Sequence, residues 1–218
     1  MSLAKTIRER VFDPDKGGPL SLALAARGRR WDEFQARFPE ISDMQVLDLG
    51  GRPSFWTSAP VRPKHVTCVN IQGGISSDVP WIDYVLGDAC APPLGDFDLV
   101  VSNSLLEHVG GHLQRMKLAD AVRSSADRYW VQTPYRYFPI EPHWLFPGMQ
   151  WLPHRARVEI SLRWPFGHVQ TNTREAAEDR VNEIELVGIN QMRGYFPDAS
   201  LWYERFGGFV KSLVAVKA

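Results

Sequence analysis

The sequence predicts one α/β domain built on a mainly parallel sheet with helices on both faces. From Gln45 onward, turn residues separate five short β-rich runs, QVLDL, HVTCVNI, DYVLGDA, FDLVVS and RYWVQT. Helical stretches alternate with these runs, a pattern typical of a parallel sheet. Near the end, SLWYERF and KSLVAVK flank Gly207 and Gly208, which predicts an antiparallel hairpin that closes the sheet. The 218 residues are enough for one core, so we expect a single domain over residues 1–218.

The amino-acid composition indicates which kinds of partner the protein can bind. The 25 Lys and Arg residues balance the 25 Asp and Glu residues, so no overall field attracts a nucleic acid or an anionic membrane. No apolar run approaches the length of about 20 residues that spans a bilayer, and the N-terminus lacks the apolar segment of a signal peptide. Cys68 and Cys90 have no metal-site spacing. We therefore expect a cytoplasmic protein that acts on a small-molecule or oligosaccharide acceptor.

The first element is predicted to be a helical cover over residues 1–43. Within SLALAARGRRWDEFQARF, apolar residues are spaced for one face of one or two helices; they are Leu22, Leu24, Trp31, Phe34 and Phe38. Later in the chain, LLEHVGGHLQRMKLADAVRSS, residues 105–125, is the clearest helical stretch. It follows the fourth β-rich run, as a crossover helix does.

Residues 129–166 have a different texture. They hold ten of the 25 Phe, Trp and Tyr residues and six of the 16 prolines, so we expect neither regular helix nor regular strand. This segment is predicted to be an insertion after the fifth strand, on the acceptor side of the site. Thr173 then provides a helix N-cap for TREAAEDRVNEIELV.

The turn after the first strand indicates an unusual ligand. A dinucleotide site uses G-x-G-x-x-G to place pyrophosphate on a helix N-terminus, but here VLDLGG continues with Arg52 and Pro53. A carboxylate at Asp48 would repel pyrophosphate and would favour a cationic ligand. S-adenosylmethionine carries both an ammonium and a sulfonium group, so it is the predicted cofactor.

Four segments in order resemble the class I S-adenosylmethionine-dependent methyltransferases. VLDLGG is similar to their first motif, VTCVNI to the second strand, and LGDACAPPLGDFDLVVSNSLLEHV to the third and fourth motifs. The resemblance implies a Rossmann-like three-layer sheet with strand order 3-2-1-4-5-7-6 and an antiparallel last strand. It also implies that eight residues bind the cofactor, namely Asp48, Gly50, Gly51, Asn70, Asp88, Ala89, Ser102 and Asn103.

The chain departs from that family at two places. Arg52 stands where a second glycine is usual, and Asn70 stands where an acid usually takes the ribose hydroxyls; the amide accepts only through its carbonyl oxygen. Two structural alternatives stay open. Asp48 could cap the next helix, and Asp88 could be a turn residue.

The predicted acceptor chemistry depends on QTPYRYFPIEPHWLFP, residues 132–147. An alcohol acceptor must lose a proton as its oxygen attacks, which requires a base within hydrogen-bond reach. His143 is the predicted base, Glu141 orients it or binds a hydroxyl, and His108 is the second candidate. The amide- and amine-methylating members of the family usually carry an Asp/Asn-Pro-Pro-aromatic signature where this chain has SNSLL, so a hydroxyl acceptor is favoured.

Three nearby residues are predicted to bind the acceptor, with Tyr137 and Trp144 as stacking faces and Arg136 as a hydroxyl or acid partner. The alternative is that these rings pack a satellite core and that His143 bonds a carbonyl. His108 and His112 are four residues apart, but Gly110 and Gly111 intervene and no metalloprotease glutamate is present. We therefore predict no metal there.

A looser resemblance links TPYRYFPIEPHWLFP and YFPDASLWYERFGGFVKSLVAVK to mycobacterial sugar O-methyltransferases of the methylmannose polysaccharide pathway. It implies O-methylation of a mannose-type sugar or oligosaccharide. Methylation of a small phenol or lipid is an alternative, and a non-catalytic binding module with the same fold is another. The sequence leaves the modified hydroxyl, the oligomeric state and any need for a divalent metal open.

Overall fold

The computed structural model describes residues 21–93, 95–167 and 169–218, and side chains from residue 28 onward. The predicted helical cover is therefore described only from Ser21, and the side chains of Leu22 and Leu24 lie outside the described part. Between its gaps, the described chain contains no helix that is both long enough and apolar enough to cross a membrane.

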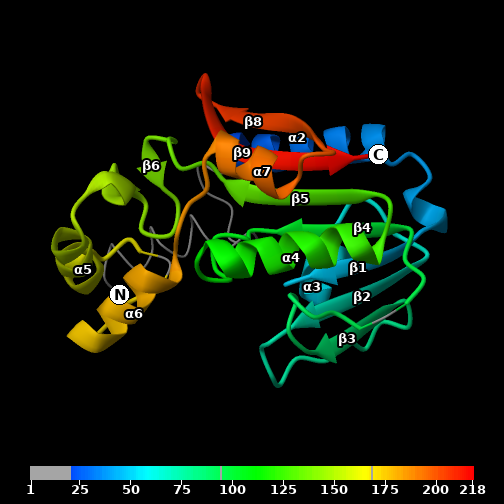
Figure 1. The fold of residues 1–218 in the computed structure, drawn as a ribbon, viewed down its shortest axis with the longest axis horizontal. Coiled ribbons are helices and arrows are strands. Elements are labelled where there is room, and N and C mark those ends of the chain that lie inside the picture. Colours follow the sequence, from blue (N-terminus) through cyan, green and yellow to red (C-terminus); the bar gives the residue numbers. More distant parts are fainter. Residues whose placement is uncertain (1–20, 94, 168) are drawn as a thin grey trace.

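Seven strands form one sheet in the order β3-β2-β1-β4-β5-β9-β8 (Figure 1). Their bounds are β1 Gln45–Leu49, β2 His65–Asn70, β3 Ile82–Leu86, β4 Leu99–Asn103, β5 Tyr129–Pro134, β8 Ser200–Phe206 and β9 Phe209–Lys217. Strands β1 to β5 run parallel, whereas β9 pairs antiparallel with both β5 and β8. This confirms the predicted strand order 3-2-1-4-5-7-6, the antiparallel last strand and the terminal hairpin.

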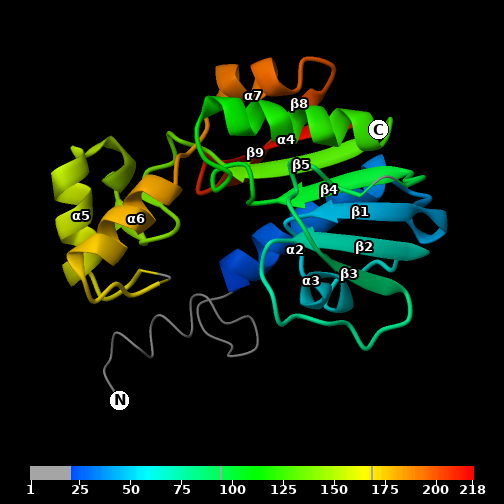
Figure 2. The same cartoon turned by 60° about the horizontal axis from the view of Figure 1, so that its bottom comes forward.

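Helices cover both faces of the sheet (Figure 2). Their bounds are α2 Ser21–Arg37, α3 Pro53–Thr57, α4 His112–Ser125, α5 His154–Arg163, α6 Arg174–Glu183 and α7 Ile189–Tyr195. Buried side chains of α4 and α7 form one core with the sheet, and those of α2 and α3 form a second core on its other face. The central strands are therefore buried on both sides, which accounts for their continuous apolar runs.

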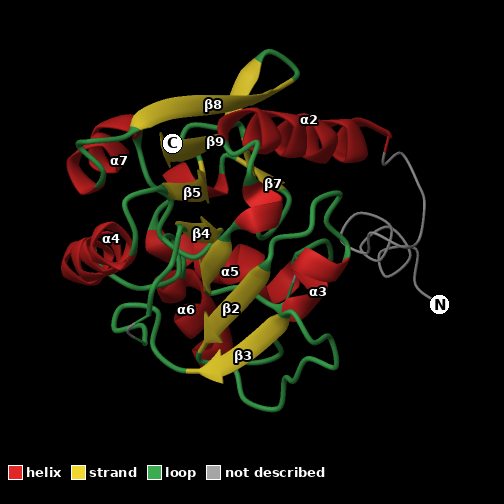
Figure 3. Cartoon of the chain, turned by 90° about the vertical axis from the view of Figure 1, so that its right-hand side faces the viewer, coloured by secondary structure: helices red, strands yellow, loops and turns green. Residues whose placement is uncertain are grey.

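The described part of the N-terminal segment packs against the sheet. Phe34 and Phe38 are buried, and the Phe34 ring meets Trp130 of β5 edge to face at 5.3 Å. Figure 3 shows α2 beside β8, where Arg30 pairs with the buried Glu204 at 2.6 Å. A short 3-10 helix, η1 (Ile41–Asp43), then leads into β1.

The crossover after β4 begins its helix later than predicted. Residues 105–111 form turns, and α4 starts only at His112. Gly110 has φ of +101°, a left-handed conformation that ends any helix extending from the LLEHV segment. The expectation of one helix over residues 105–125 was thus wrong in its first seven residues, and this frees the LLEHV side chains to face the sheet edge.

The predicted insertion is more regular than the sequence suggested. Residues 129–134 are strand β5 of the main sheet, and the remainder contains the hairpin strands β6 (Ile140–Glu141) and β7 (Phe146–Pro147), the 3-10 helix η2 (Met149–Trp151) and helix α5. The expectation of no regular structure over 129–166 was therefore wrong. The predicted N-cap of the next helix is confirmed, because the Thr173 hydroxyl accepts the backbone N–H of Ala176 at 3.2 Å.

Helices α5 and α6 pack on each other around a small core of their own and lie beyond the carboxyl ends of the parallel strands (Figures 1 and 2). Two backbone contacts tie this region to the sheet edge. The N–H of Glu185 donates to the carbonyl of Glu107 at 3.0 Å, and Tyr135 forms an isolated bridge with Val187. The insertion is therefore held against the end of the sheet where ligands bind in open α/β folds.

Candidate active site

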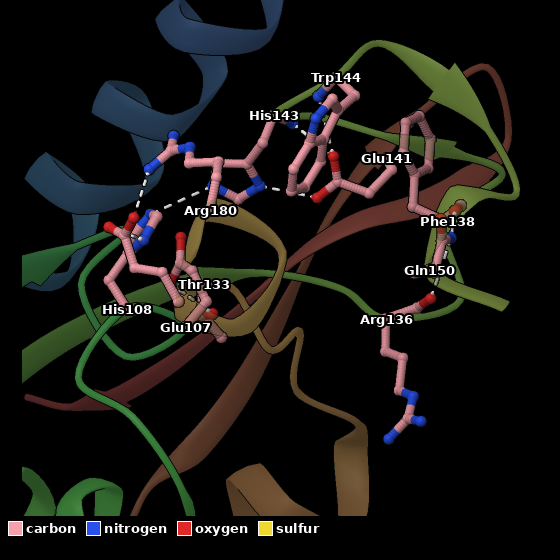
Figure 4. Close-up of polar contacts among 11 residues, drawn as sticks. Glu107, His108, Thr133, Arg136, Phe138, Glu141, His143, Trp144, Gln150 and Arg180 are labelled. Carbon is pink, nitrogen blue, oxygen red and sulfur yellow. Dashed lines mark hydrogen bonds and ion pairs between the residues drawn. The ribbon is translucent and has the colours of Figure 1, made fainter. Parts of the chain in front are cut away.

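Glu141 holds His143 in one orientation (Figure 4). Glu141 lies on β6 and is 2% exposed. Its Oε1 is 2.7 Å from Nδ1 of His143, and its Oε2 accepts the backbone N–H groups of His143 and Trp144 at 2.7 and 2.9 Å. Because a carboxylate only accepts, Nδ1 of His143 carries the proton and Nε2 presents a lone pair. This is the orientation that the predicted base requires.

His108 meets His143 across a gap between two segments. The two Nε2 atoms are 3.2 Å apart, and the rings lie nearly perpendicular at 88°. Nδ1 of His108 is 3.3 Å from Oε1 of Glu183 on α6, an ion-pair distance without hydrogen-bond alignment. Burial and the nearby charge of His143 lower the pKa of His108 to about 4. The three predicted catalytic residues therefore lie together.

Glu107 is a fourth member of this group. It is fully buried, and its Oε2 accepts the hydroxyl of Thr133 on β5 at 2.9 Å. Its Oε1 has no hydrogen-bond partner in the described chain, and burial raises the pKa of the carboxyl to about 7. Glu107 was not predicted from the sequence, although its position directly before His108 was an available signal.

On the other side of β4, the glycine turn after β1 borders a cavity. Asp48, Gly50, Gly51 and Asn103 help to line a space of about 550 Å³ together with α3. The Asp48 carboxyl is buried, and its Oδ2 accepts the indole N–H of Trp56 at 2.7 Å. Burial raises its pKa to about 7. Asp48 therefore faces the start of α3 in addition to the cavity.

Asn70 and Ser102 make contacts within the fold. The amide nitrogen of Asn70 donates to the carbonyls of Gly50 and Gly51 at 2.8 and 3.3 Å, and its oxygen accepts the N–H of Gln72. Ser102 donates to the carbonyl of Leu49 at 3.0 Å. These contacts hold the glycine turn and β1 in place. The predicted cofactor contacts of Asn70 and Ser102 stay predictions.

The third strand ends in a tight turn. Asp88 is exposed and its Oδ1 accepts the N–H of Cys90 at 2.8 Å, which is the turn role left open for it. Ala89 packs into the main core. Neither residue is among those that line the cavity beside α3. Their roles beside an adenine ring stay predictions.

The predicted acceptor-binding residues divide between core and surface. Trp144 is 4% exposed and packs within the α5–α6 core, as the packing alternative proposed. Tyr137 is 58% exposed and meets Tyr135 edge to face. Arg136 borders a cavity of about 270 Å³ that also contacts Glu141, Gln150 and Arg157. The structure therefore provides a polar recess behind the Glu141 carboxylate.

The metal pairing considered from sequence does not form. Nδ1 of His112 lies 2.9 Å from the Tyr195 hydroxyl, at the first turn of α4. His108 pairs instead with His143, 35 positions away in sequence. His108 and His112 therefore have different partners, although they are only four residues apart in sequence.

A search against protein-family models found no match, and a search of curated proteins found none either. Solved structures do resemble the chain. Magnesium protoporphyrin IX methyltransferase from Synechocystis PCC 6803, with bound S-adenosylhomocysteine, aligns over 99% of this chain and 95% of its own at 11% identity and a TM-score of 0.54. The N-methyltransferase NodS from Bradyrhizobium japonicum WM9, with the same ligand, aligns over 99% and 97% at 12% identity and a TM-score of 0.53.

The chain has the fold of the class I methyltransferases. A Rhodobacter sphaeroides protein described as a Zn-dependent alcohol dehydrogenase also aligns, over 85% of this chain and 88% of its own, at 10% identity and a TM-score of 0.54. At such identities the likeness concerns the fold alone. The chemistry of this methyltransferase fold must therefore be argued from its own residues.

Proposed function

We propose that the chain is an S-adenosylmethionine-dependent methyltransferase whose acceptor is a hydroxyl group. Support for the cofactor comes from the methyltransferase fold, from neighbours crystallised with S-adenosylmethionine or S-adenosylhomocysteine, and from the turn at Gly50, whose φ is +81°. A left-handed glycine lets the backbone turn sharply at the carboxyl end of β1. Ligands bind at this end in open α/β sheets.

One observation carries the choice of a hydroxyl acceptor, namely the His143–His108 pair held by Glu141. A neutral alcohol oxygen becomes a competent nucleophile only as it loses its proton, and the pair presents ring nitrogens suited to that task. The pair lies by the carboxyl ends of β4 and β5, because Glu107 is anchored to Thr133. In the sheet, β4 lies next to β1, and β5 lies next to β4, so the pair lies one to two strands from the glycine turn on β1.

The reaction balances as a single displacement. The acceptor oxygen forms a bond to the methyl carbon while the C–S bond breaks and its electron pair stays on sulfur. Neutral S-adenosylhomocysteine leaves, and the acceptor proton is lost at the histidine pair. Because the methyl carbon starts on a positive sulfonium, charge is dispersed during transfer, and alignment with exclusion of water dominates the rate.

We further propose that a sugar supplies the hydroxyl. The recess behind Glu141 has a volume of about 270 Å³, and its polar lining includes the guanidinium groups of Arg136 and Arg157, which donate hydrogen bonds. The rest of its lining includes four apolar side chains, Trp144, Met149, Ile184 and Leu186. A polyhydroxyl ligand uses the guanidinium donors, whereas a hydrocarbon chain would leave them unpaired. This recess supports a sugar ahead of the alternative lipid acceptor.

The test is transfer of a labelled methyl group from S-adenosylmethionine to a panel of mannosides, oligosaccharides, phenols and fatty alcohols. An O-methylated mannoside, identified by carbon NMR, is the expected product. A product with a phenol alone would replace the sugar, and an N-methylated product would overturn the hydroxyl assignment. Binding of S-adenosylhomocysteine with no transfer to any acceptor would favour the non-catalytic binding module.

A further inference from the structure

Three side chains from two segments direct donor atoms at one point between β4 and β6. The residues are Glu107, His108 and His143 (Figure 4). One ligand atom from each residue lies within 4.8 Å of the others. Glu107 and His108 follow β4, whereas His143 follows β6, so the group exists only because the insertion folds back over the sheet edge.

One ring of the pair has a fixed proton and the other does not. Nδ1 of His143 donates to Glu141 at 2.7 Å, so its Nε2 presents a lone pair to Nε2 of His108 at 3.2 Å. Nδ1 of His108 lies 3.3 Å from the Glu183 carboxylate but has no aligned hydrogen bond, so the proton of His108 can occupy either ring nitrogen. The gap between the two Nε2 atoms is therefore filled either by an N–H of His108 that donates to His143 or by a cation that both nitrogens bind.

The spacing suits a cation. Two imidazole nitrogens, each about 2.0 to 2.1 Å from a tetrahedral zinc ion, lie about 3.3 Å apart, and the observed separation is 3.2 Å. An N–H···N hydrogen bond would use only the two nitrogens. The buried Oε1 of Glu107, which has no partner in the described chain, would then keep an uncompensated desolvation cost. A cation uses all three atoms.

The surrounding contacts match those of metal-binding histidines. Such a histidine usually donates its other ring N–H to a carboxylate, which fixes the ring and raises its basicity. Glu141 has this position beside His143, and the Glu183 carboxylate lies 3.3 Å from the other ring nitrogen of His108. Thr133 in turn holds the other oxygen of Glu107 at 2.9 Å. Each of the three donors is thus positioned by a second residue.

We infer that Glu107, His108 and His143 form a binding site for one first-row divalent cation of the zinc type. Three protein ligands leave a fourth position open, and, resting on the proposed function, that position receives the acceptor hydroxyl. The cation lowers the pKa of the bound hydroxyl, so that its proton passes to solvent water before the oxygen attacks the methyl group. His143 is then a ligand and not the base that the sequence predicted.

The test uses the full chain after treatment with a chelator and without S-adenosylmethionine. Calorimetric titration with Zn²⁺ is expected to show one site, and Co²⁺ is expected to produce the visible absorption of a tetrahedral complex. His143→Ala and Glu107→Gln should weaken Zn²⁺ binding by more than about 100-fold, the upper end of the effect of outer contacts. His112→Ala is the matched control, because His112 bonds Tyr195 outside the group.

A wild-type protein that binds neither ion would overturn the inference. Correctly folded variants that bind Zn²⁺ with wild-type affinity would overturn it as well. The methyl-transfer assay with and without chelator separates the two proposals. Transfer that persists in a protein unable to bind the ions contradicts the metal site and leaves the proposed function standing. Binding of one cation with no transfer to any acceptor contradicts the proposed function and leaves the metal site standing.

Discussion

The two halves of the sheet edge are built by different means. At β1, polar side chains bond to the elements around the cavity, Asn70 to the glycine turn and Asp48 to Trp56 of α3. At β4 and β5, side chains from separate segments bond to each other, as His108 does to His143. The first half is thus held by contacts that support the backbone, and the second by contacts between functional side chains. We therefore expect substitutions in the two halves to affect binding and turnover separately.

The largest effect is expected from His143→Ala. Removing the ring deletes either the base or a ligand of the proposed cation, so turnover at saturating acceptor should fall by about two to four orders of magnitude. Affinity for S-adenosylhomocysteine should stay near the wild-type value, because the ring lies about two strands from the glycine turn. Steady-state kinetics and calorimetry measure the two quantities, and His112→Ala serves as control. A large loss of cofactor affinity would contradict the proposal that the two halves of the sheet edge affect binding and turnover separately.

Glu141→Gln should have the next largest effect. Its remaining carbonyl oxygen will accept the backbone N–H groups of His143 and Trp144, which turns the amide NH₂ toward Nδ1 of His143. That ring must then carry its proton on Nε2, the atom that faces His108. Turnover should fall about 10- to 100-fold, as for other carboxylates behind a functional histidine. Glu183→Gln, a more exposed carboxylate, should cost less; equal losses would mean that orientation of His143 is not the cause.

Gly50→Ala tests the other half. The residue has φ of +81°, and an added Cβ would lie 2.9 Å from Leu105. The left-handed conformation costs an alanine about 1 to 2 kcal/mol, so the free turn should relax to another conformation. Restoring the turn on binding should then lower cofactor affinity roughly 5- to 30-fold. Gly74→Ala is the matched control, since Gly74 has φ of +75° with open space around it. Isothermal titration with S-adenosylhomocysteine should show normal affinity for the control, and an equal loss in both variants would assign the effect to backbone strain alone.

Asp48→Asn should have the smallest effect on turnover and a visible effect on stability. Burial raises the folded pKa of Asp48 from 3.8 to about 7, so the folded state resists ionisation while the unfolded state ionises near pH 4. Wild-type stability should therefore fall as pH rises from about 4 to 7. Asparagine retains an acceptor for Trp56 and removes this cost, which is about 1 to 4 kcal/mol at neutral pH.

Thermal unfolding at pH 5 and pH 8 checks this, and the gain of the variant over wild type should grow with pH. Asp98→Asn is the control, because Asp98 is an exposed carboxylate that bonds the opposite end of β1. A gain for Asp48→Asn that stays constant between the two pH values would contradict the assigned pKa.

The sequence predicted the parts of the fold that local patterns encode. Continuous apolar runs such as VLDL and the Gly207–Gly208 turn lie within the elements they indicated, and Thr173 caps its helix. Helix α5 was missed because prolines and aromatic residues surround it. It is stabilised by burial of Val158 against α6, a contact that no local pattern reveals.

The candidate site was predicted in part for the same reason. The sequence identified His143, Glu141 and His108 by their chemistry, and the structure brings them together. It did not identify Glu107, because the partner of that carboxyl, Thr133, is 26 positions away. Nor did it reveal that Asn70 bonds the glycine turn, since the sequence of a strand end does not indicate which neighbour its amide meets.

The most direct test of the account is a crystal structure of the full chain with S-adenosylhomocysteine. We predict that the sulfur faces the histidine pair across the end of β4, about 6 to 8 Å from Nε2 of His143. That distance leaves room for a C–S bond, an attack distance of about 3 to 3.5 Å and one hydrogen bond of about 3 Å. A sulfur directed toward α3, with the glycine turn between it and His143, would contradict the claim that the two halves form one active site.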